Sequence, residues 1–229
     1  MNQRRGKLFV ISGPSGAGKG TLRRELFKAL PELVYSVSVT TRKPRIGEIN
    51  GVDYFFISPA EFERMRDNGE LIEWAEVHGN LYGTPKAFVE ERLKEGKSVV
   101  LEIDVQGALQ IKRRFPEAIL IFILPPSQEE LSLRLKGRGT ESPEELELRL
   151  KNASLEMNRR ELYDYAVVND DVKRASSELI DIVRKEIYGL GGECKDVLST
   201  DRGSNEEGKH KHSLSFDDGD RKEGKSDKQ

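Results

Sequence analysis

Residues 13–20 form a glycine-rich segment, Gly-Pro-Ser-Gly-Ala-Gly-Lys-Gly, between a short apolar run and a helical pattern. Glycines let the backbone curl so that successive N–H groups face one anion, and the start of a helix favours negative charge. Lys19 adds a mobile positive charge for β- and γ-phosphates. The alternative is a glycine-rich strand-to-helix turn with an incidental lysine. The placement predicts a nucleotide-binding P-loop made of Gly13, Pro14, Ser15, Gly16, Ala17, Gly18, Lys19, Gly20 and Thr21.

This P-loop departs from the usual pattern at Gly20, because a Ser or Thr normally follows the lysine. Thr21 lies one position later, which rotates its side chain by about 100° around a helix, so it does not simply replace that hydroxyl. We therefore expect Mg²⁺ to be held mainly by ATP phosphates and water, with no protein metal ligand. The spelling Gly-Lys-Gly-Thr also resembles adenylate kinases, so the segment alone predicts only a binder of nucleotide phosphates.

A second group of residues with binding chemistry lies between residues 40 and 57. Arg42 and Arg45 are three positions apart, and Tyr54 follows in the same stretch. Two planar guanidinium groups and a phenol donor suit a phosphate dianion. Further along the chain, Asp104 follows a buried-strand pattern, and ligands of open α/β sheets bind beyond the carboxyl ends of strands. Asp104 is therefore expected to face the site, although it can also cap the helix that follows.

At these residues the sequence resembles the guanylate kinase family. The resemblance covers roughly residues 5–188 and includes the motifs Ile-Glu-Trp at 72–74, Tyr-Gly-Thr at 82–84, Glu-Ile-Asp at 102–104, Gly-Arg-Gly at 137–139 and Val-Asn-Asp-Asp at 168–171. It implies that the phosphate of GMP is held by Arg42, Arg45, Tyr54 and Tyr82. It implies that the guanine is surrounded by Ser38, Glu73, Thr84 and Asp104. On the ATP side it implies phosphate contacts from Arg134, Arg138 and Arg149, and an adenine-end contact from Asn169.

Glu73 has a chemical reason to recognise guanine. Guanine offers two adjacent donors, N1–H and the 2-amino group, which one carboxylate accepts together, whereas adenine presents an acceptor at N1. A site built around a buried acceptor discriminates by ~10⁴ or more, because the wrong base leaves that group unpaired. Two alternatives stay open. Glu73 can be an outward-facing strand residue beside Trp74, and Thr84 can cap the helix that follows it.

Arg134 and Arg138 lie four positions apart, where a continuous helix would place them on one face. Gly137 and Gly139 flank Arg138, and the break over residues 140–143 suits a hinged lid. Phosphoryl transfer depends on positioning and charge neutralisation, to which one arginine can contribute ~10³–10⁵ in rate. The alternative is a solvated basic face matched by Glu141, Glu144 and Glu145.

Strand and helix patterns alternate from residue 1 to about residue 190. Apolar or alternating strand segments are expected over residues 7–12, 53–57, 71–77, 98–103, 118–124 and 165–168. Helices are expected after Ser58, after Asp104, in two stretches broken near residues 137–139, and over residues 19–30, 85–95 and 172–188. Continuous apolar strands between helices indicate a parallel sheet covered on both faces.

The expected fold class is α/β: a P-loop NTPase-type parallel-sheet core flanked by helices, with an inserted mixed α/β GMP-binding lobe and a helical lid. A guanylate kinase domain is expected over residues 1–190. Its parts are the core (1–35, 89–134 and 148–190), the GMP-binding lobe (36–88) and the lid (135–147). Residues 191–229 are expected to form a disordered charged tail, because residues 201–229 carry 8 acidic and 7 basic side chains but few apolar ones.

Composition narrows the possible functions. The 229 residues include 38 basic and 40 acidic side chains, and this net charge of −2 argues against coating nucleic acid or an acidic membrane. A single cysteine, Cys194, excludes an internal disulfide and a multi-cysteine zinc site. No run approaches the ~18 apolar residues of a membrane span, and the first residues lack a signal-peptide layout. We therefore expect a soluble, cytoplasmic protein.

Together these patterns predict a nucleoside monophosphate kinase that transfers the γ-phosphoryl group of MgATP to GMP, giving GDP and ADP in purine nucleotide metabolism. The expected partners are ATP and GMP, without nucleic acid or membrane, and the oligomeric state is not indicated. One alternative is a non-catalytic guanylate-kinase-like module that binds a phosphopeptide; another is a kinase for a different nucleoside monophosphate. The expected catalytic residues are Lys19, Arg42, Arg138 and Arg149.

Overall fold

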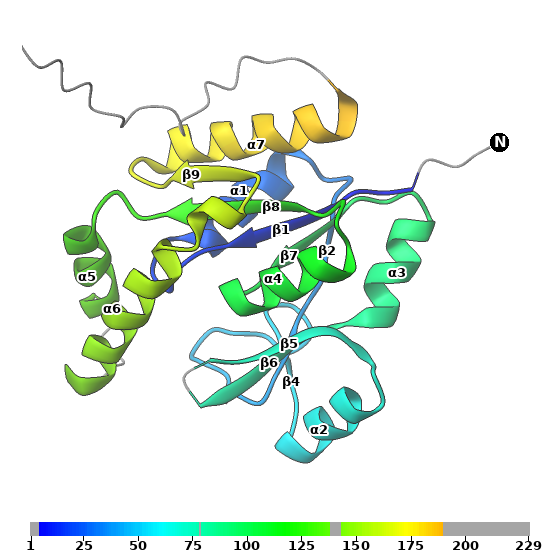
Figure 1. Ribbon diagram of the computed structural model, residues 1–229, viewed down its shortest axis with the longest axis horizontal. Helices are drawn as coiled ribbons and strands as arrows, with labels where there is room; N and C mark the ends of the chain where they lie inside the picture. Colours follow the sequence, from blue (N-terminus) through cyan, green and yellow to red (C-terminus); the bar gives the residue numbers. More distant parts are fainter. Residues whose placement is uncertain (1–4, 78, 138–142, 190–229) are drawn as a thin grey trace, which may run out of the picture. The chain divides into compact units, whose positions relative to one another are not determined.

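The larger of two sheets contains five strands: β1 (Leu8–Ser12), β2 (Val34–Tyr35), β7 (Val99–Glu102), β8 (Ile119–Leu124) and β9 (Tyr165–Val168). They run parallel in the order β2-β7-β1-β8-β9 (Figure 1). The computed structural model describes residues 5–77, 79–137 and 143–189, all within the first of the two units into which the chain divides, Met1–Lys195.

Helices cover this sheet on both faces: α1 (Lys19–Ala29), α3 (Lys86–Lys94), α4 (Val105–Arg114) and α7 (Val172–Tyr188). Because side chains alternate along a strand, Phe9 and Ile11 of β1 pack with α1 and α7, whereas Leu8 and Val10 pack with α3 and α4. Figure 1 shows α7 and α4 on opposite sides of the strands. Among the described residues, no helix has both the length and the apolar character that crossing a membrane requires.

The smaller sheet is mixed and contains β3 (Val39–Thr40), β4 (Phe55–Phe56), β5 (Leu71–Val77) and β6 (Asn80–Pro85). Its order is β4-β3-β6-β5, with β3 parallel to β4 and β6 antiparallel to both β3 and β5. Helix α2 (Pro59–Asp67) begins after Ser58, whose side chain accepts a hydrogen bond from the Glu61 N–H. Phe62 of α2 packs with Val39 and Leu71. The predicted fold class, a parallel core with a mixed α/β lobe, is confirmed.

Two helices border the predicted lid, α5 (Gln128–Lys136) and α6 (Pro143–Met157), and the short η1 (Arg160–Leu162) follows. Leu131 and Leu135 of α5 pack against Ala153 of α6. Residues 138–142, which include Arg138, and the predicted tail over residues 191–229 lie outside the described residues. The boundaries of the lobe, the lid and the tail therefore stay predictions.

The predicted bounds of three elements, β5, β9 and α7, agree with the structure. The strand expected over residues 53–57 is wrong at its ends, since only Phe55–Phe56 pairs with β3. The helix expected from residue 85 begins at Lys86, because Pro85 still pairs with Leu71 in the sheet. Strands β2, β3 and β6 were missed. Two residues, as in β2 and β3, are too few to show an alternation, and β6 contains Asn, Gly and Pro, which are depleted in strands.

Candidate active site

A pocket of about 610 Å³ lies among the P-loop, the smaller sheet and helix α6. Most residues singled out from the sequence line it: Gly13, Ser15, Gly16, Gly18, Lys19, Gly20, Thr21, Ser38, Arg42, Arg45, Tyr54, Glu73, Tyr82, Asp104 and Arg149. Five others in the described part of the chain do not line it: Pro14, Ala17, Thr84, Arg134 and Asn169. Glu102, a further polar residue of the Glu-Ile-Asp motif, lines the pocket as well. The pocket also contains residues for which the sequence predicted no role: Arg24, Val77, Asn80, Ile103, Leu148 and Glu156.

The P-loop connects β1 to α1 at the carboxyl end of the parallel strands. Gly18 immediately precedes α1 with φ 88°, in the left-handed region where a Cβ is strained. The Lys19 ammonium donates hydrogen bonds to the carbonyl oxygens of Gly13 and Pro14, at 2.7 and 3.1 Å. The lysine is therefore folded along the loop, where a bound phosphate would also lie.

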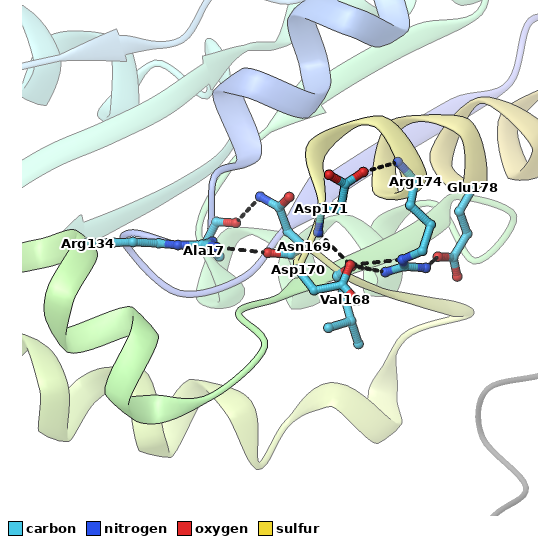
Figure 2. Close-up of polar contacts among 8 residues, drawn as sticks. All are labelled: Ala17, Arg134, Val168, Asn169, Asp170, Asp171, Arg174 and Glu178. Carbon is cyan, nitrogen blue, oxygen red and sulfur yellow. Dashed lines mark hydrogen bonds and ion pairs between the residues drawn. The ribbon is translucent and has the colours of Figure 1, made fainter.

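Asn169 supports the P-loop from behind, as Figure 2 shows. Its side chain is 3% exposed, and its Nδ2 donates to the Ala17 carbonyl oxygen at 2.8 Å. A Cβ at Gly18 would overlap that same amide nitrogen. Arg134 donates to the Asn169 carbonyl oxygen at 3.1 Å and to Glu130 Oε1 at 3.0 Å. Asn169 and Arg134 thus brace the loop in this structure, and Arg134 pairs with Glu130 in its own helix.

The lobe side of the pocket carries the predicted phosphate-binding residues. The Arg42 guanidinium donates to Glu48 Oε1 at 2.8 Å and lies 5.4 Å from the centroid of the Tyr54 ring. The rings of Tyr54 and Tyr82 meet edge to face at 5.9 Å. The backbone N–H of Arg45 donates to Glu48 Oε2 at 2.7 Å. Glu48 therefore holds the Arg42 side chain and the backbone at Arg45. Its signal in the sequence was its place three residues after Arg45.

Glu73 lies at the inner end of this lobe surface. Its side chain is only 3% exposed, whereas the neighbouring Trp74 is 39% exposed, so the outward-facing alternative for Glu73 is wrong. The Thr84 hydroxyl donates to Glu73 Oε1 at 2.6 Å. Thr84 does not cap α3 either, since Pro85 occupies that position without a side-chain hydrogen bond. Burial raises the pKa of Glu73 to about 7, against the opposing effect of the Thr84 hydrogen bond.

Asp104 borders the same pocket from the end of β7. Its Oδ1 accepts a hydrogen bond from the Gly107 N–H at 2.9 Å, so the predicted capping of α4 is confirmed. Glu102, the last residue of β7 and two positions before Asp104, forms an ion pair with Arg23 at 3.3 Å. A Cβ at Gly20 would lie 3.6 Å from Glu102 Oε1, which places this carboxylate beside the position of the missing P-loop hydroxyl.

Helix α6 contributes the remaining wall. The Arg149 guanidinium donates to the Ser15 hydroxyl at 3.5 Å, which connects this helix to the P-loop. Glu156 lies two helical turns later on the same side, and burial raises its pKa to about 7, opposed by the charge of Lys19. The spacing of seven residues from Arg149 was a signal for Glu156 that the sequence analysis did not use.

Comparison with known proteins agrees with this arrangement. The family model for guanylate kinase matches residues 5–186. The guanylate kinase of Rubrobacter xylanophilus is 53% identical over 191 residues, which span 83% of this chain and 100% of the relative. That of Bacillus cereus (strain ZK / E33L) is 54% identical over 184 residues, 80% of this chain and 90% of the relative.

Structural comparison points the same way. The crystal structure of guanylate kinase from Anaplasma phagocytophilum is similar with a TM-score of 0.69 and 39% sequence identity. The alignment spans 82% of this chain and 89% of that chain. With a family model over most of the chain, relatives above half identity and a matching experimental fold, this chain belongs to the guanylate kinase family.

Proposed function

We propose that the pocket seats GMP against the smaller sheet and the ATP phosphates in the P-loop, and that the γ-phosphoryl group passes between them. As a member of its family the chain is an ATP:GMP phosphotransferase. The observation that carries the assignment of the pocket is the buried Glu73 carboxylate, which lines the same cavity as Lys19 and the P-loop. One pocket thus offers a carboxylate acceptor for the base of GMP and a P-loop for the phosphates of ATP, so both nucleotides can bind together.

GMP binding is derived from the lobe residues. The adjacent N1–H and 2-amino donors of guanine pair with the Glu73 carboxylate, while Thr84 holds its Oε1 from the other side. Ser38 and Asp104 complete the surroundings of the base. The phosphate of GMP enters between Arg42 and Arg45, where it competes with Glu48 for the Arg42 guanidinium. Tyr54 and Tyr82 supply phenol donors beside it.

Transfer requires positioning and charge neutralisation. Lys19 exchanges its carbonyl partners for the β- and γ-phosphates, and Arg149, already at Ser15, neutralises charge on the transferring group. Arg138 is expected to act with Arg149, and Arg134 and Asn169 to support the ATP side. No general base is needed, because a phosphate oxygen of GMP is anionic at neutral pH. A low-dielectric, water-excluded pocket strengthens each of these interactions.

Magnesium fits this pocket as an ion held by phosphate oxygens and water. In the described part of the chain, no group of three or more His, Cys, Asp or Glu side chains is arranged to hold a metal. Glu102 and Asp104, which line the pocket beside Gly20, suit its oxygen-loving chemistry as acceptors from metal-bound water. Bound Mg²⁺ would neutralise charge on the β- and γ-phosphates. A cytoplasmic location and a role in purine nucleotide metabolism stay predictions.

The decisive assay measures ADP formation with GMP, AMP, UMP and CMP side by side in the wild type and in Glu73→Gln. We expect turnover with GMP only, and a fall of about 10²–10³-fold in kcat/KM for GMP in the variant with an ATP KM within about twofold. Glu76→Gln is the matched control, since Glu76 lies exposed on the same strand. Equal loss for both nucleotides would contradict the guanine assignment. Binding of a phosphopeptide without ADP formation would favour the non-catalytic alternative.

A further inference from the structure

The outer edge of the smaller sheet is covered by polar side chains of α4. Strand β5 is the edge strand of the order β4-β3-β6-β5. The Gln110 amide bonds both backbone groups of Trp74: Oε1 accepts from the N–H at 3.3 Å, and Nε2 donates to the carbonyl oxygen at 2.6 Å. Arg114 Nη1 donates to the Ile72 carbonyl oxygen at 2.5 Å. The backbone on both sides of Glu73 is therefore fixed to α4, much as a further strand would fix it.

Gly107 lies on the same helix, three positions before Gln110, and is buried. A Cβ at Gly107 would overlap Oε2 of Glu73, and it would lie 3.0 Å from Cδ of Glu73 and 3.2 Å from Oδ1 of Asp104. The backbone here is right-handed helix, so its conformation does not call for glycine. Glycine inside a helix is destabilising relative to alanine. What separates glycine from alanine at this position is the space that the Glu73 carboxylate occupies.

We propose that Gly107 is a specificity-determining residue of the guanine site, because its missing side chain leaves the space in which the Glu73 carboxylate lies. The inference rests on the proposed function, in which that carboxylate accepts the two donors of guanine. Gly107 also donates its N–H to Asp104 Oδ1, so a single turn of α4 positions both acids at the base end of the pocket. Gly107 acts through Glu73 and is a positioning residue.

The hydrogen bonds around β5 determine which group moves when a side chain at residue 107 clashes with Glu73. Strand β5 is held on one edge by β6 and on the other by Gln110 and Arg114, so its backbone resists displacement. The atoms that would be overlapped are at the end of the Glu73 side chain, which can rotate. A methyl group at residue 107 therefore moves the carboxylate out of line with the guanine donors, while the P-loop, built from β1 and α1, is unaffected.

The test is Gly107→Ala, measured in the full chain with steady-state kinetics and thermal unfolding. We expect kcat/KM for GMP to fall roughly 10- to 100-fold, mainly through KM, with the ATP KM within about twofold. The second arm shortens the acid. Glu73→Asp should lower kcat/KM for GMP in the wild type, but should lower it much less, or raise it, in the Gly107→Ala background, because the shorter side chain vacates the space.

Each outcome decides the proposal. A GMP kcat/KM within twofold of the wild type in Gly107→Ala, or equal effects of Glu73→Asp in the two backgrounds, overturns it. If Gly107→Ala does not fold, recovery of folding on adding Glu73→Asp reveals the same steric coupling, and failure to recover counts against it. Glu73→Gln distinguishes failure of the proposed guanine site from failure of the role of Gly107. Unchanged GMP use in that variant defeats the proposed function, whereas its loss beside an unaffected Gly107→Ala defeats only the role of Gly107.

Discussion

In the proposed function, the two ends of the pocket bind their ligand groups with different parts of the chain. The proposed phosphate-binding residues of the P-loop are consecutive, at 13–20, and Lys19 is the cationic side chain among them. At the proposed guanine end, the binding groups are side chains from separate parts of the fold: Ser38, Glu73, Thr84 and Asp104. One site is continuous in sequence and the other exists only once the chain has folded.

The difference follows from what each ligand group demands. A phosphate is recognised by charge and by any set of converging donors, which a single bent segment supplies locally. A base is recognised by acceptors that stay unpaired when the wrong base arrives, and a carboxylate can be buried only where packing and a hydrogen-bonded partner offset its desolvation. Glu73 meets this demand through Thr84 on one side and the space over Gly107 on the other.

Removal of the Lys19 ammonium, the proposed cation of the P-loop, should produce the largest effect. Lys19→Met is expected to lower turnover by about 10³-fold, since it deletes a cation from the transferring phosphates. GMP should still bind with a Kd within about twofold, because the guanine end is made of other elements. Calorimetric titration of GMP and a coupled ADP assay measure the two quantities. Turnover near that of the wild type would end the P-loop assignment, and a parallel loss of GMP binding would end the independence of the two ends.

The same contrast explains what the sequence could predict. The P-loop was predicted from its own residues, because glycine spacing after an apolar run carries the geometry. Glu73 could be assigned only through the family resemblance, because nothing local distinguishes a buried glutamate from an exposed one on a strand. Glu48 and Glu156 were missed, since their roles depend on which charges the fold brings near them. Helix α7 and strand β5 were predicted with their bounds, whereas the two-residue strands β2 and β3 and the strand β6, with its Asn, Gly and Pro, were not.

The pH dependence of GMP binding should report on the proposed guanine end of the pocket, because Glu73 titrates there. Burial raises the pKa of Glu73 to about 7. The charge of Asp104 also raises this pKa, whereas the Thr84 hydrogen bond and the charge of Arg114 lower it. Guanine requires the ionised carboxylate, so below pH 7 binding must first remove a proton. GMP affinity should therefore rise up to about tenfold per pH unit towards pH 7 and level off above it. Titrations between about pH 5.5 and 8 measure this slope.

The reference for that slope is Glu73→Gln, which lacks the titrating group. The phosphate of GMP has its own pKa near ~6 and contributes in both proteins. Only the difference between the wild type and the variant reports on Glu73, and proton release measured in buffers of different ionisation enthalpy gives it directly. Identical slopes in the two proteins would mean that Glu73 is already ionised in the free protein, and that the buried acid does not set the pH response.

The smallest effect is expected behind the P-loop, where the buried Asn169 side chain supports the backbone. Asn169→Ala removes the buried hydrogen bond from Nδ2 to the Ala17 carbonyl oxygen at 2.8 Å. We expect the free energy of unfolding to fall by about 1–2 kcal/mol and the ATP KM to rise severalfold, with the GMP KM unchanged. Denaturant titration and steady-state kinetics measure these changes.

Arg174→Ala is the matched control, because Arg174 lies in the first turn of α7 and bonds to Asp170, the residue after Asn169 (Figure 2). Its side chain is 48% exposed and pairs with Asp170 at 2.7 Å and Glu178 at 2.8 Å. Exposed pairs contribute about 0–1 kcal/mol, so this variant should lose little stability and keep both KM values. If Arg174→Ala raised the ATP KM as much as Asn169→Ala, the phosphate end would depend on the whole turn rather than on one bond. The P-loop would then be less local than its continuous sequence suggests, and the contrast with the guanine end would narrow.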